Sequence, residues 1–173
     1  GHLHAAPLAA ALARLWQARL WVHVDGIEAW VPRDAVVKRC LGAAHLITSA
    51  SRFTRRRLLE WVRIEPERVR VLPNTVGRQF MPRPRRPELM VRYGLAGRKV
   101  ILTVGRLSSS ERYKGHDRII RVLAGVAREC GPLAYLIVGS GDDRVRLETL
   151  ARNQGGDAMV IFAGYVGEAE LPD

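Results

Sequence analysis

The chain has 173 residues, and its 47% hydrophobic content is enough for one packed domain or two small lobes, which excludes an intrinsically disordered protein. No apolar run approaches the roughly 18 residues of a membrane span, and the first residues lack the basic and apolar regions of a signal peptide. The net charge of +11 is concentrated in residues 1–86, which hold 16 basic and 6 acidic residues, whereas residues 87–173 hold 12 and 11. This asymmetry indicates two lobes with different surfaces.

A basic first half suits nucleic acid, an anionic membrane surface or a phosphorylated ligand. The other interpretation is simple solvation, because 25 of the 28 basic residues are arginines spread along the chain. Cys40 and Cys130 are isolated, with no CxxC pair and no histidine cluster at metal-ligand spacing. We therefore expect reduced cysteines of a cytoplasmic protein and no metal site.

Apolar segments of strand type alternate with helical segments through the first half. In chain order the expected elements are a helix at 5–18, a strand at 20–24, a helix at 33–44, a strand at 45–50, a helix capped by Ser51, and a strand at 68–74.

A stretch rich in proline and arginine then interrupts the pattern, and it is the best linker candidate. Beyond it the expected order is strand, helix, strand, helix, strand, with the strands in "KVILTVG", "AYLIVG" and "AMVIFAG". Apolar strands that alternate with amphipathic helices predict a parallel sheet covered on both faces. We expect a first lobe over residues 1–80, a linker over 81–98 and a second lobe over 99–173.

The stretch "TVGRLSSSERYKGHD" places two of its three cations, Arg106 and Lys114, at the two ends of the loop between the carboxyl end of a strand and the start of a helix. Ligands of open parallel sheets bind beyond that end of the strands, and helix N-termini there suit phosphate. Gly105 lets the backbone approach a ligand, and an arginine fork with a lysine charge fits a diphosphate. Spacing alone leaves a second interpretation open, a pair of solvated loop cations.

The wider sequence resembles glycosyltransferase family 4, retaining transferases of the GT-B fold. The nucleotide-sugar lobe of that family is matched by "ILTVGRLSSSERYKGHDRIIRVL", "AYLIVGSGDDRVRLETLA" and "VIFAGYVGEAELPD". The second half of its acceptor lobe is matched by "GHLHAAPLAA", "DGIEAW", "LITSASRFTRRRL" and "RVRVLPNTV". The resemblance implies an α/β protein of two Rossmann-like lobes, each incomplete, so that the chain is an internal fragment and inactive by itself.

The resemblance also implies the activity: transfer of a sugar from a nucleoside-diphosphate sugar to a saccharide, lipid-linked or small-molecule acceptor. Arg106 and Lys114 then bind the donor diphosphate and stabilise the leaving nucleoside diphosphate. No cofactor and no metal are expected, since no DxD carboxylate pair is present. The expected location is the cytoplasm, with contact to the inner face of the membrane as an option.

Five further residues are candidates for contact with the nucleotide. Gly105 precedes the cations; Gly139 and Gly141 follow the second strand of the second lobe; Gly164 and Val166 follow its third strand. For the "GSG" loop a tight strand-to-helix turn is an equally good explanation.

The acceptor side is less defined. Many relatives carry a histidine immediately before the glycine of the segment that matches "DGIEAW", where this chain has Asp25, with His23 two residues earlier. Alternation along a strand puts His23 and Asp25 on one face, so either is a candidate catalytic group. Glu111, between the two cations in sequence, either orients them, contacts the sugar or is a solvated carboxylate.

Three alternatives remain open. A nucleotide-sugar epimerase or a phosphorylase shares the GT-B fold. A basic module could bind nucleic acid or a membrane, although no nucleic-acid motif is present and we expect no nucleic-acid partner. A lobe without catalytic activity could serve only in binding or assembly.

Overall fold

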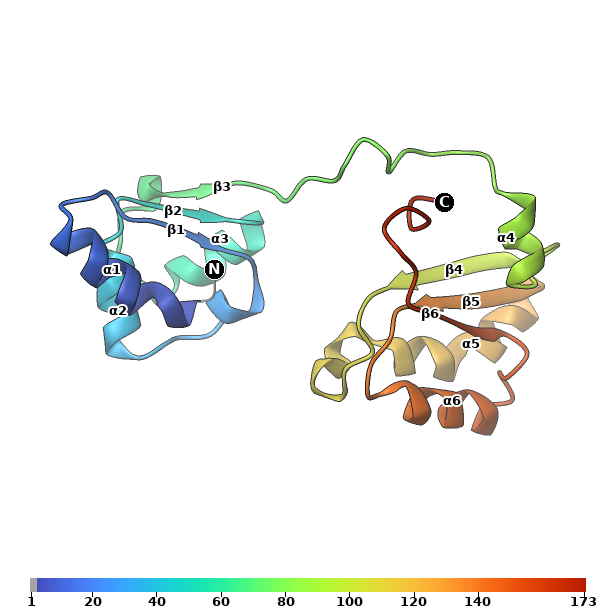
Figure 1. Ribbon diagram of the computed structural model, residues 1–173. Coiled ribbons are helices and arrows are strands. Elements are labelled where there is room, and N and C mark those ends of the chain that lie inside the picture. Colours follow the sequence, from blue (N-terminus) through green and yellow to red (C-terminus); the bar gives the residue numbers. More distant parts are fainter. Residues whose placement is uncertain (1–2) are drawn as a thin grey trace. The chain divides into compact units, whose positions relative to one another are not determined.

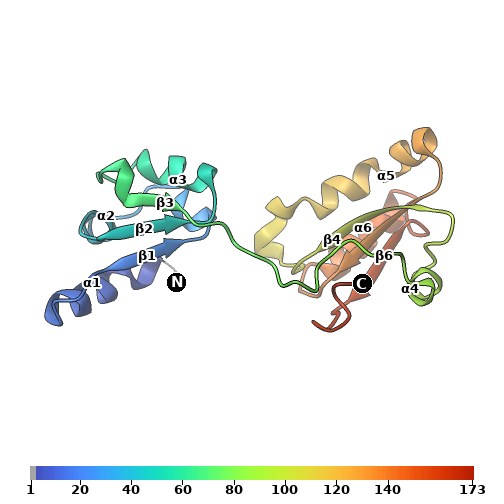
Figure 2. The ribbon, with the colours of Figure 1, turned by 90° about the horizontal axis from the view of Figure 1, so that it is seen from above.

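The computed structural model describes residues 3–173, and the chain divides between Gly77 and Arg78 into two compact units. These are called the first unit and the second unit below. Each unit holds a three-stranded parallel sheet, with strand orders β1-β2-β3 and β4-β5-β6 (Figures 1 and 2). Consecutive strands are joined through helical segments, as parallel pairing requires. The predicted α/β class with two Rossmann-like lobes is confirmed.

The elements of the first unit are α1 (Ala6–Leu15), β1 (Trp21–Val24), α2 (Ala35–Gly42), β2 (Leu46–Ser49), α3 (Arg52–Leu59) and β3 (Val69–Val71). Two of its helices start at a side chain that accepts a backbone N–H. Asp34 accepts from Val37 at 2.9 Å, and Ser51 accepts from Thr54 at 3.0 Å. The expected Ser51 cap is confirmed.

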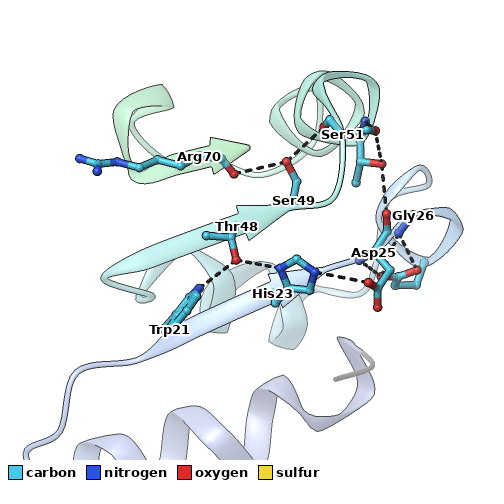
Figure 3. A network of polar contacts seen from close by, with 10 residues as sticks. Trp21, His23, Asp25, Gly26, Thr48, Ser49, Ser51 and Arg70 are labelled. Atoms are coloured by element: carbon cyan, nitrogen blue, oxygen red, sulfur yellow. Dashed lines mark hydrogen bonds and ion pairs between the residues drawn. The ribbon is translucent and has the colours of Figure 1, made fainter. Parts of the chain in front are cut away.

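The core of the first unit lies on one face of its sheet. Val24, Ile47 and Val69 are fully buried there and pack with side chains of α1, α2 and α3. Because side chains alternate along a strand, the opposite face carries the intervening residues. His23 and Thr48 are register partners on that opposite face, and Figure 3 shows both.

The elements of the second unit are α4 (Pro87–Arg92), β4 (Lys99–Val104), the 3-10 turn η4 (Ser109–Lys114), α5 (His116–Cys130), β5 (Leu133–Val138), α6 (Arg144–Asn153) and β6 (Val160–Gly164). All six residues of β5 are buried, which is why this strand reads as an unbroken apolar run. One face of the sheet packs against α5 and α6 (Figure 1). The other face packs with Leu95, Met90 and Tyr93, but Leu102 and Val104 on it stay exposed.

The stretch expected to be a linker, 81–98, contains the helix α4. Pro87 opens this helix, a position where proline costs nothing because the first N–H of a helix has no partner within the helix. Met90 and Leu95 then pack on the second sheet. The segment therefore belongs to the second unit, and the division of the chain lies earlier, at Gly77.

Candidate functional site

The loops that follow β4 and β5 are joined by backbone hydrogen bonds at the carboxyl end of the second sheet. Gly105 donates to the carbonyl of Val138 at 2.9 Å, and Leu107 donates to the carbonyl of Ser140 at 2.9 Å. The β4–α5 loop, which carries both candidate cations, thus runs beside the "GSG" loop for three residues. Because Gly105 directly follows β4 and bonds to the last residue of β5, the sheet fixes where the β4–α5 loop begins.

Gly139 and Gly141 make this close approach possible. A Cβ atom added to Gly139 would lie 2.0 Å from the carbonyl oxygen of Gly105, and one added to Gly141 would lie 2.0 Å from that of Leu107. Both distances are far inside van der Waals contact, and Gly139 also has a φ of +137°. The packing of the two loops alone therefore accounts for both glycines. Their contact with a nucleotide stays a prediction.

Arg106 and Lys114 are brought to one place by the loop between β4 and α5. Their common contact is the carboxylate of Glu111: Arg106 Nη2 lies 2.8 Å from Oε1, and Lys114 Nζ lies 2.7 Å from Oε2. The Lys114 and Glu111 side chains are 27% and 20% exposed, whereas that of Arg106 is 77% exposed. The lysine is thus the inner member of the pair and the arginine the outer member.

The carboxylate of Glu111 is held in its charged form. Hydrogen bonding from Lys114 is the main cause that lowers its pKa, and the charges of Arg106 and Lys114 add to the effect, against a desolvation that raises it. Glu111 itself lies at a kink inside η4, with φ −114° and ψ 32°, and its N–H donates to the carbonyl of Ser108 at 2.9 Å. Of the three interpretations of Glu111, the geometry matches a carboxylate that orients both cations.

Beneath the cations, His116 at the start of α5 belongs to a buried polar chain that the sequence did not indicate. Its Nδ1 lies 3.0 Å from the hydroxyl oxygen of Tyr135, and that hydroxyl donates to Thr103 Oγ1 at 3.1 Å. Since the tyrosine proton goes to Thr103, His116 Nδ1 carries the proton that Tyr135 accepts. The chain links α5, β5 and β4 directly under the loop of Lys114.

Two adjacent aspartates after the "GSG" loop fix the local structure. Asp142 accepts from the hydroxyl and the N–H of Ser109, the latter at 3.2 Å, and so ties this loop to η4. Asp143 is buried and bonds Arg146 with both oxygens, at 2.7 and 2.6 Å. Hydrogen bonds from Ser109 and from Arg146 are the main causes that lower the pKa of Asp142 and Asp143 respectively.

Gly164 and Val166, the remaining candidates, have different surroundings. The carbonyl of Gly164 accepts from Gly139 N–H at 2.7 Å, so Gly164 belongs to the joined loops. Val166 packs with Leu136 and Leu171 in the apolar cluster on the sheet face opposite α5 and α6. That environment is not the one around the cations.

The first unit holds a second polar network, which runs along β1 from Trp21 to Asp25, just beyond the end of the strand (Figure 3). Trp21 Nε1–H donates to Thr48 Oγ1 at 2.9 Å, and Thr48 Oγ1 lies 2.8 Å from His23 Nδ1. The other ring nitrogen, His23 Nε2, lies 3.3 Å from Asp25 Oδ1. His23 and Asp25 are therefore on one face and in contact, as alternation along the strand predicts.

The turn that presents Asp25 is held by Glu28. The carboxylate of Glu28 accepts from the N–H of Asp25 at 2.7 Å and from that of Gly26 at 3.2 Å, and so fixes the backbone of this turn. The Asp25 side chain is 63% exposed, and that of His23 is 29% exposed. The pair combines a carboxylate and an imidazole within reach of solvent, a set that can bind hydroxyl groups.

Several arginines of the first unit donate to backbone carbonyls of the same unit. Arg55 donates to the carbonyls of Val69 and Pro66, and Arg57 and Arg68 donate to further carbonyls. Within residues 3–173, Arg52 and Arg56 of α3 form no ion pair, and Arg56 stacks over Phe53 at 5.5 Å. Over the same residues, no cluster of three or more His, Cys, Asp or Glu is placed to hold a metal ion, and no helix is long and apolar enough to cross a membrane.

Comparison with known proteins gives consistent matches. The family described as Glycosyl transferases group 1 matches residues 86–173, half of the chain. An alpha-D-kanosaminyltransferase of Streptomyces kanamyceticus is 31% identical over 86% of this chain and 37% of its own length. A GDP-mannose-dependent alpha-(1-6)-phosphatidylinositol monomannoside mannosyltransferase of Mycolicibacterium smegmatis is 31% identical over 82% of this chain and 36% of its own length.

Solved structures agree on the fold. Anabaena HepE in complex with UDP and glucose has a TM-score of 0.75 at 18% identity, over 98% of this chain and 47% of HepE. A glycosyltransferase of Rickettsia africae has a TM-score of 0.67 at 18% identity, over 96% and 52%. The chain spans little more than a third of the curated relatives' length. With two Rossmann-like units and a family match over the whole second unit from α4 onward, the chain belongs to the glycosyl transferases of group 1.

Proposed function

We propose that the protein is a retaining glycosyltransferase of family 4, which transfers a sugar from a nucleoside-diphosphate sugar to an acceptor without a metal ion. In this proposal Arg106 and Lys114 hold the donor diphosphate. The observation that supports it is their common contact with Glu111, at 2.8 and 2.7 Å. Two cations that reach one carboxylate also reach one diphosphate.

The two cations act on the leaving group. When the bond between sugar and phosphate breaks, negative charge grows on the departing oxygen, and fixed cations stabilise that charge more than they stabilise the bound donor. Arg106 supplies a planar fork for two phosphate oxygens, and Lys114 a compact charge. The start of α5, directly after Gly115, adds the partial positive charge of a helix N-terminus.

The relatives support a proposal for the donor and acceptor classes. The mycobacterial relatives are named for GDP-mannose and for a phosphatidylinositol mannoside, and HepE was crystallised with UDP and with UDP-glucose. We propose a hexose linked to UDP or GDP as donor, and a saccharide or a lipid-linked saccharide as acceptor. His23 and Asp25 are the proposed contacts of the acceptor hydroxyl groups.

The proposed setting is the cytoplasm, with the first unit in contact with the inner face of the membrane when the acceptor is lipid-linked. Arg52 and Arg56 support this part, because they lie on one short helix without ion pairs in residues 3–173, and Arg56 stacks over the half-exposed ring of Phe53. Cations next to an exposed aromatic ring suit an anionic lipid surface.

The test is calorimetric titration of the intact enzyme with UDP, GDP and ADP. Arg106→Ala and Lys114→Ala should each weaken binding of the preferred nucleotide about tenfold to a hundredfold, since a charged hydrogen bond contributes roughly 1.5–3 kcal/mol. Lys99→Ala is the matched control, because Lys99 starts β4 and donates to the carbonyl of Cys130 at 2.9 Å. Unchanged affinity in both Arg106 and Lys114 variants would contradict the proposal.

Two further measurements address the chemistry. Turnover should persist in the presence of a chelator if no metal takes part. The anomeric configuration of the product, followed by NMR, should match that of the donor sugar. Loss of activity in chelator, or an inverted product, would contradict these parts of the proposal and leave the diphosphate contact standing.

A further inference from the structure

Glu111 lies between the two cations, at the place that the proposed function assigns to the donor diphosphate. Its two carboxylate oxygens are divided between them, Oε1 to Arg106 and Oε2 to Lys114, so the carboxylate bridges the cations in the way that two phosphate oxygens would. The Glu111 carboxylate brings one negative charge to the two cations, whereas a diphosphate brings at least two. Binding of a diphosphate with Glu111 in place would bring like charges into contact.

We propose that Glu111 is an internal counter-ion of the cation pair, which the donor diphosphate displaces on binding and which returns when the nucleoside diphosphate leaves. This inference rests on the proposed function of Arg106 and Lys114. It assigns Glu111 a positioning role with a regulatory consequence: the carboxylate keeps the two cations together between turnovers and competes with the product for them.

The backbone around Glu111 is anchored, so the exchange needs only the side chain to move. The N–H of Glu111 is bonded to Ser108, and the turn is tied at Ser109 to Asp142. Gly115 closes the turn, with its N–H donating to the carbonyl of Arg112 at 3.0 Å. A glutamate has three rotatable bonds beyond its Cα, and the Glu111 side chain is 20% exposed, so rotation toward solvent frees both cations without breaking these backbone bonds.

The two cations differ in the strength of the contact with Glu111 that each loses when the diphosphate replaces the carboxylate. Arg106 is mostly exposed, so its contact with Glu111 is screened by solvent and weak. Lys114 is more enclosed, and its contact with Glu111 is the stronger one. We therefore expect Glu111 and the nucleoside diphosphate to compete mainly for Lys114.

The deciding variant is Glu111→Gln, which keeps the shape of the side chain and removes its charge. We expect UDP or GDP, whichever the intact parent enzyme binds, to bind this variant about three- to tenfold more tightly in calorimetry. Uridine or guanosine, which have no phosphate, should bind the variant and the parent alike. In pre-steady-state measurements, release of the nucleoside diphosphate from Glu111→Gln should slow by a similar factor.

The control is Asp117→Asn, which removes one negative charge from the first turn of α5 without touching either cation. Asp117 instead accepts from Arg118 N–H at 3.0 Å and lies 3.8 Å from Arg146. An equal gain of affinity in Asp117→Asn would mean that the general field, not the bridge, sets the affinity, and would overturn the inference. Weaker or unchanged binding in Glu111→Gln would overturn it as well.

The double variant Glu111→Gln with Lys114→Ala separates the two proposals. If Lys114→Ala weakens diphosphate binding and the Glu111→Gln gain disappears in that background, both proposals stand. If Lys114→Ala and Arg106→Ala weaken binding but Glu111→Gln never strengthens it, the counter-ion inference alone fails. If neither Lys114→Ala nor Arg106→Ala changes diphosphate binding, the proposed function fails, and the counter-ion inference fails with it. Glu111→Ala, which removes the whole side chain beyond Cβ, should also bind the nucleoside diphosphate more tightly than the parent if the charge of Glu111 is the cause.

Discussion

His116, the first residue of α5, and Tyr135, in the middle of the neighbouring strand β5, share a 3.0 Å hydrogen bond in the interior of the second unit. Because the tyrosine hydroxyl donates to Thr103, the imidazole donates through Nδ1 and its Nε2 is a buried acceptor. Within residues 3–173 that Nε2 has no hydrogen-bond partner. A proton added there would place an unpaired charge in the core.

Stability should therefore fall as the pH drops below about 6.5, the usual pKa of histidine. Burial is the main cause that lowers the pKa of His116 and the charge of Lys114 is the second, while Asp117 and Asp143 raise it. Between the lowered pKa of the folded protein and about 6.5, His116 binds a proton in the unfolded chain but not in the folded chain. The free energy of unfolding therefore rises with pH in this range, by at most about 1.4 kcal/mol per pH unit.

The measurement is urea unfolding between pH 5 and 8 for the parent and for His116→Asn. Asparagine cannot titrate, but its amide can still donate toward Tyr135, so the difference between the two proteins isolates His116 from the carboxylates. We expect the pH dependence of the variant to be flatter below pH 6.5. Parallel curves would contradict the assignment of a neutral buried imidazole.

Gly139→Ala should destabilise the second unit strongly. The added methyl would lie 2.0 Å from the carbonyl oxygen of Gly105, so the backbone of one loop has to move, at a cost on the order of 2–4 kcal/mol. Gly155→Ala is the matched control: its φ is +65°, but no atom of residues 3–173 outside its immediate neighbours lies within 4 Å of the added Cβ, so only conformational strain of about 1 kcal/mol remains. Equal shifts of the unfolding midpoint in both variants would show that the two loops separate easily.

The acceptor side can be tested apart from the donor side. Asp25→Asn in the intact enzyme removes a charge that contacts His23 and points to solvent, so we expect transfer to the acceptor to slow about tenfold or more, with the affinity for UDP or GDP unchanged. Glu67→Gln, at an exposed position of the same unit, should leave both quantities unchanged. A parallel loss of nucleotide affinity in Asp25→Asn would contradict the separation of roles.

The β/α rhythm could be predicted from the sequence because buried parallel strands read as apolar runs, as β5 does throughout its six residues. The helix α4 was missed because Pro87 lies among other prolines, although proline also opens helices. The bridge made by Glu111 depends on the kink in η4, which no spacing rule describes. Only its distance of three residues from Lys114 was a hint of contact.

The buried chain of Thr103, Tyr135 and His116 was not anticipated either. A tyrosine within an otherwise apolar strand signals a buried hydroxyl that needs a partner, but its partners come from β4 and α5, and only the packed fold brings them together. In the same way, a glycine pair such as Gly139 and Gly141 is explained by a neighbouring loop 34 residues away in sequence, counted from Gly105 to Gly139.

Arg106→Lys should leave the intact enzyme well below parental turnover, although the charge is kept. Among residues 3–173 the hydrogen bond of Arg106 to Glu111 uses one guanidinium nitrogen, Nη2, and the side chain is 77% exposed, so the rest of its planar fork is accessible to phosphate oxygens. A lysine supplies one compact charge on a flexible stem and cannot span two oxygens in a fixed plane. We expect turnover to fall about tenfold, more than the donor KM rises, because the charge on the leaving oxygen develops in the transition state.

Steady-state kinetics at saturating acceptor, with Arg106→Ala as the lower limit, measures both quantities. Parental turnover in Arg106→Lys would mean that Arg106 acts only through its charge, and turnover equal to that of Arg106→Ala would mean that the fork supplies its whole contribution.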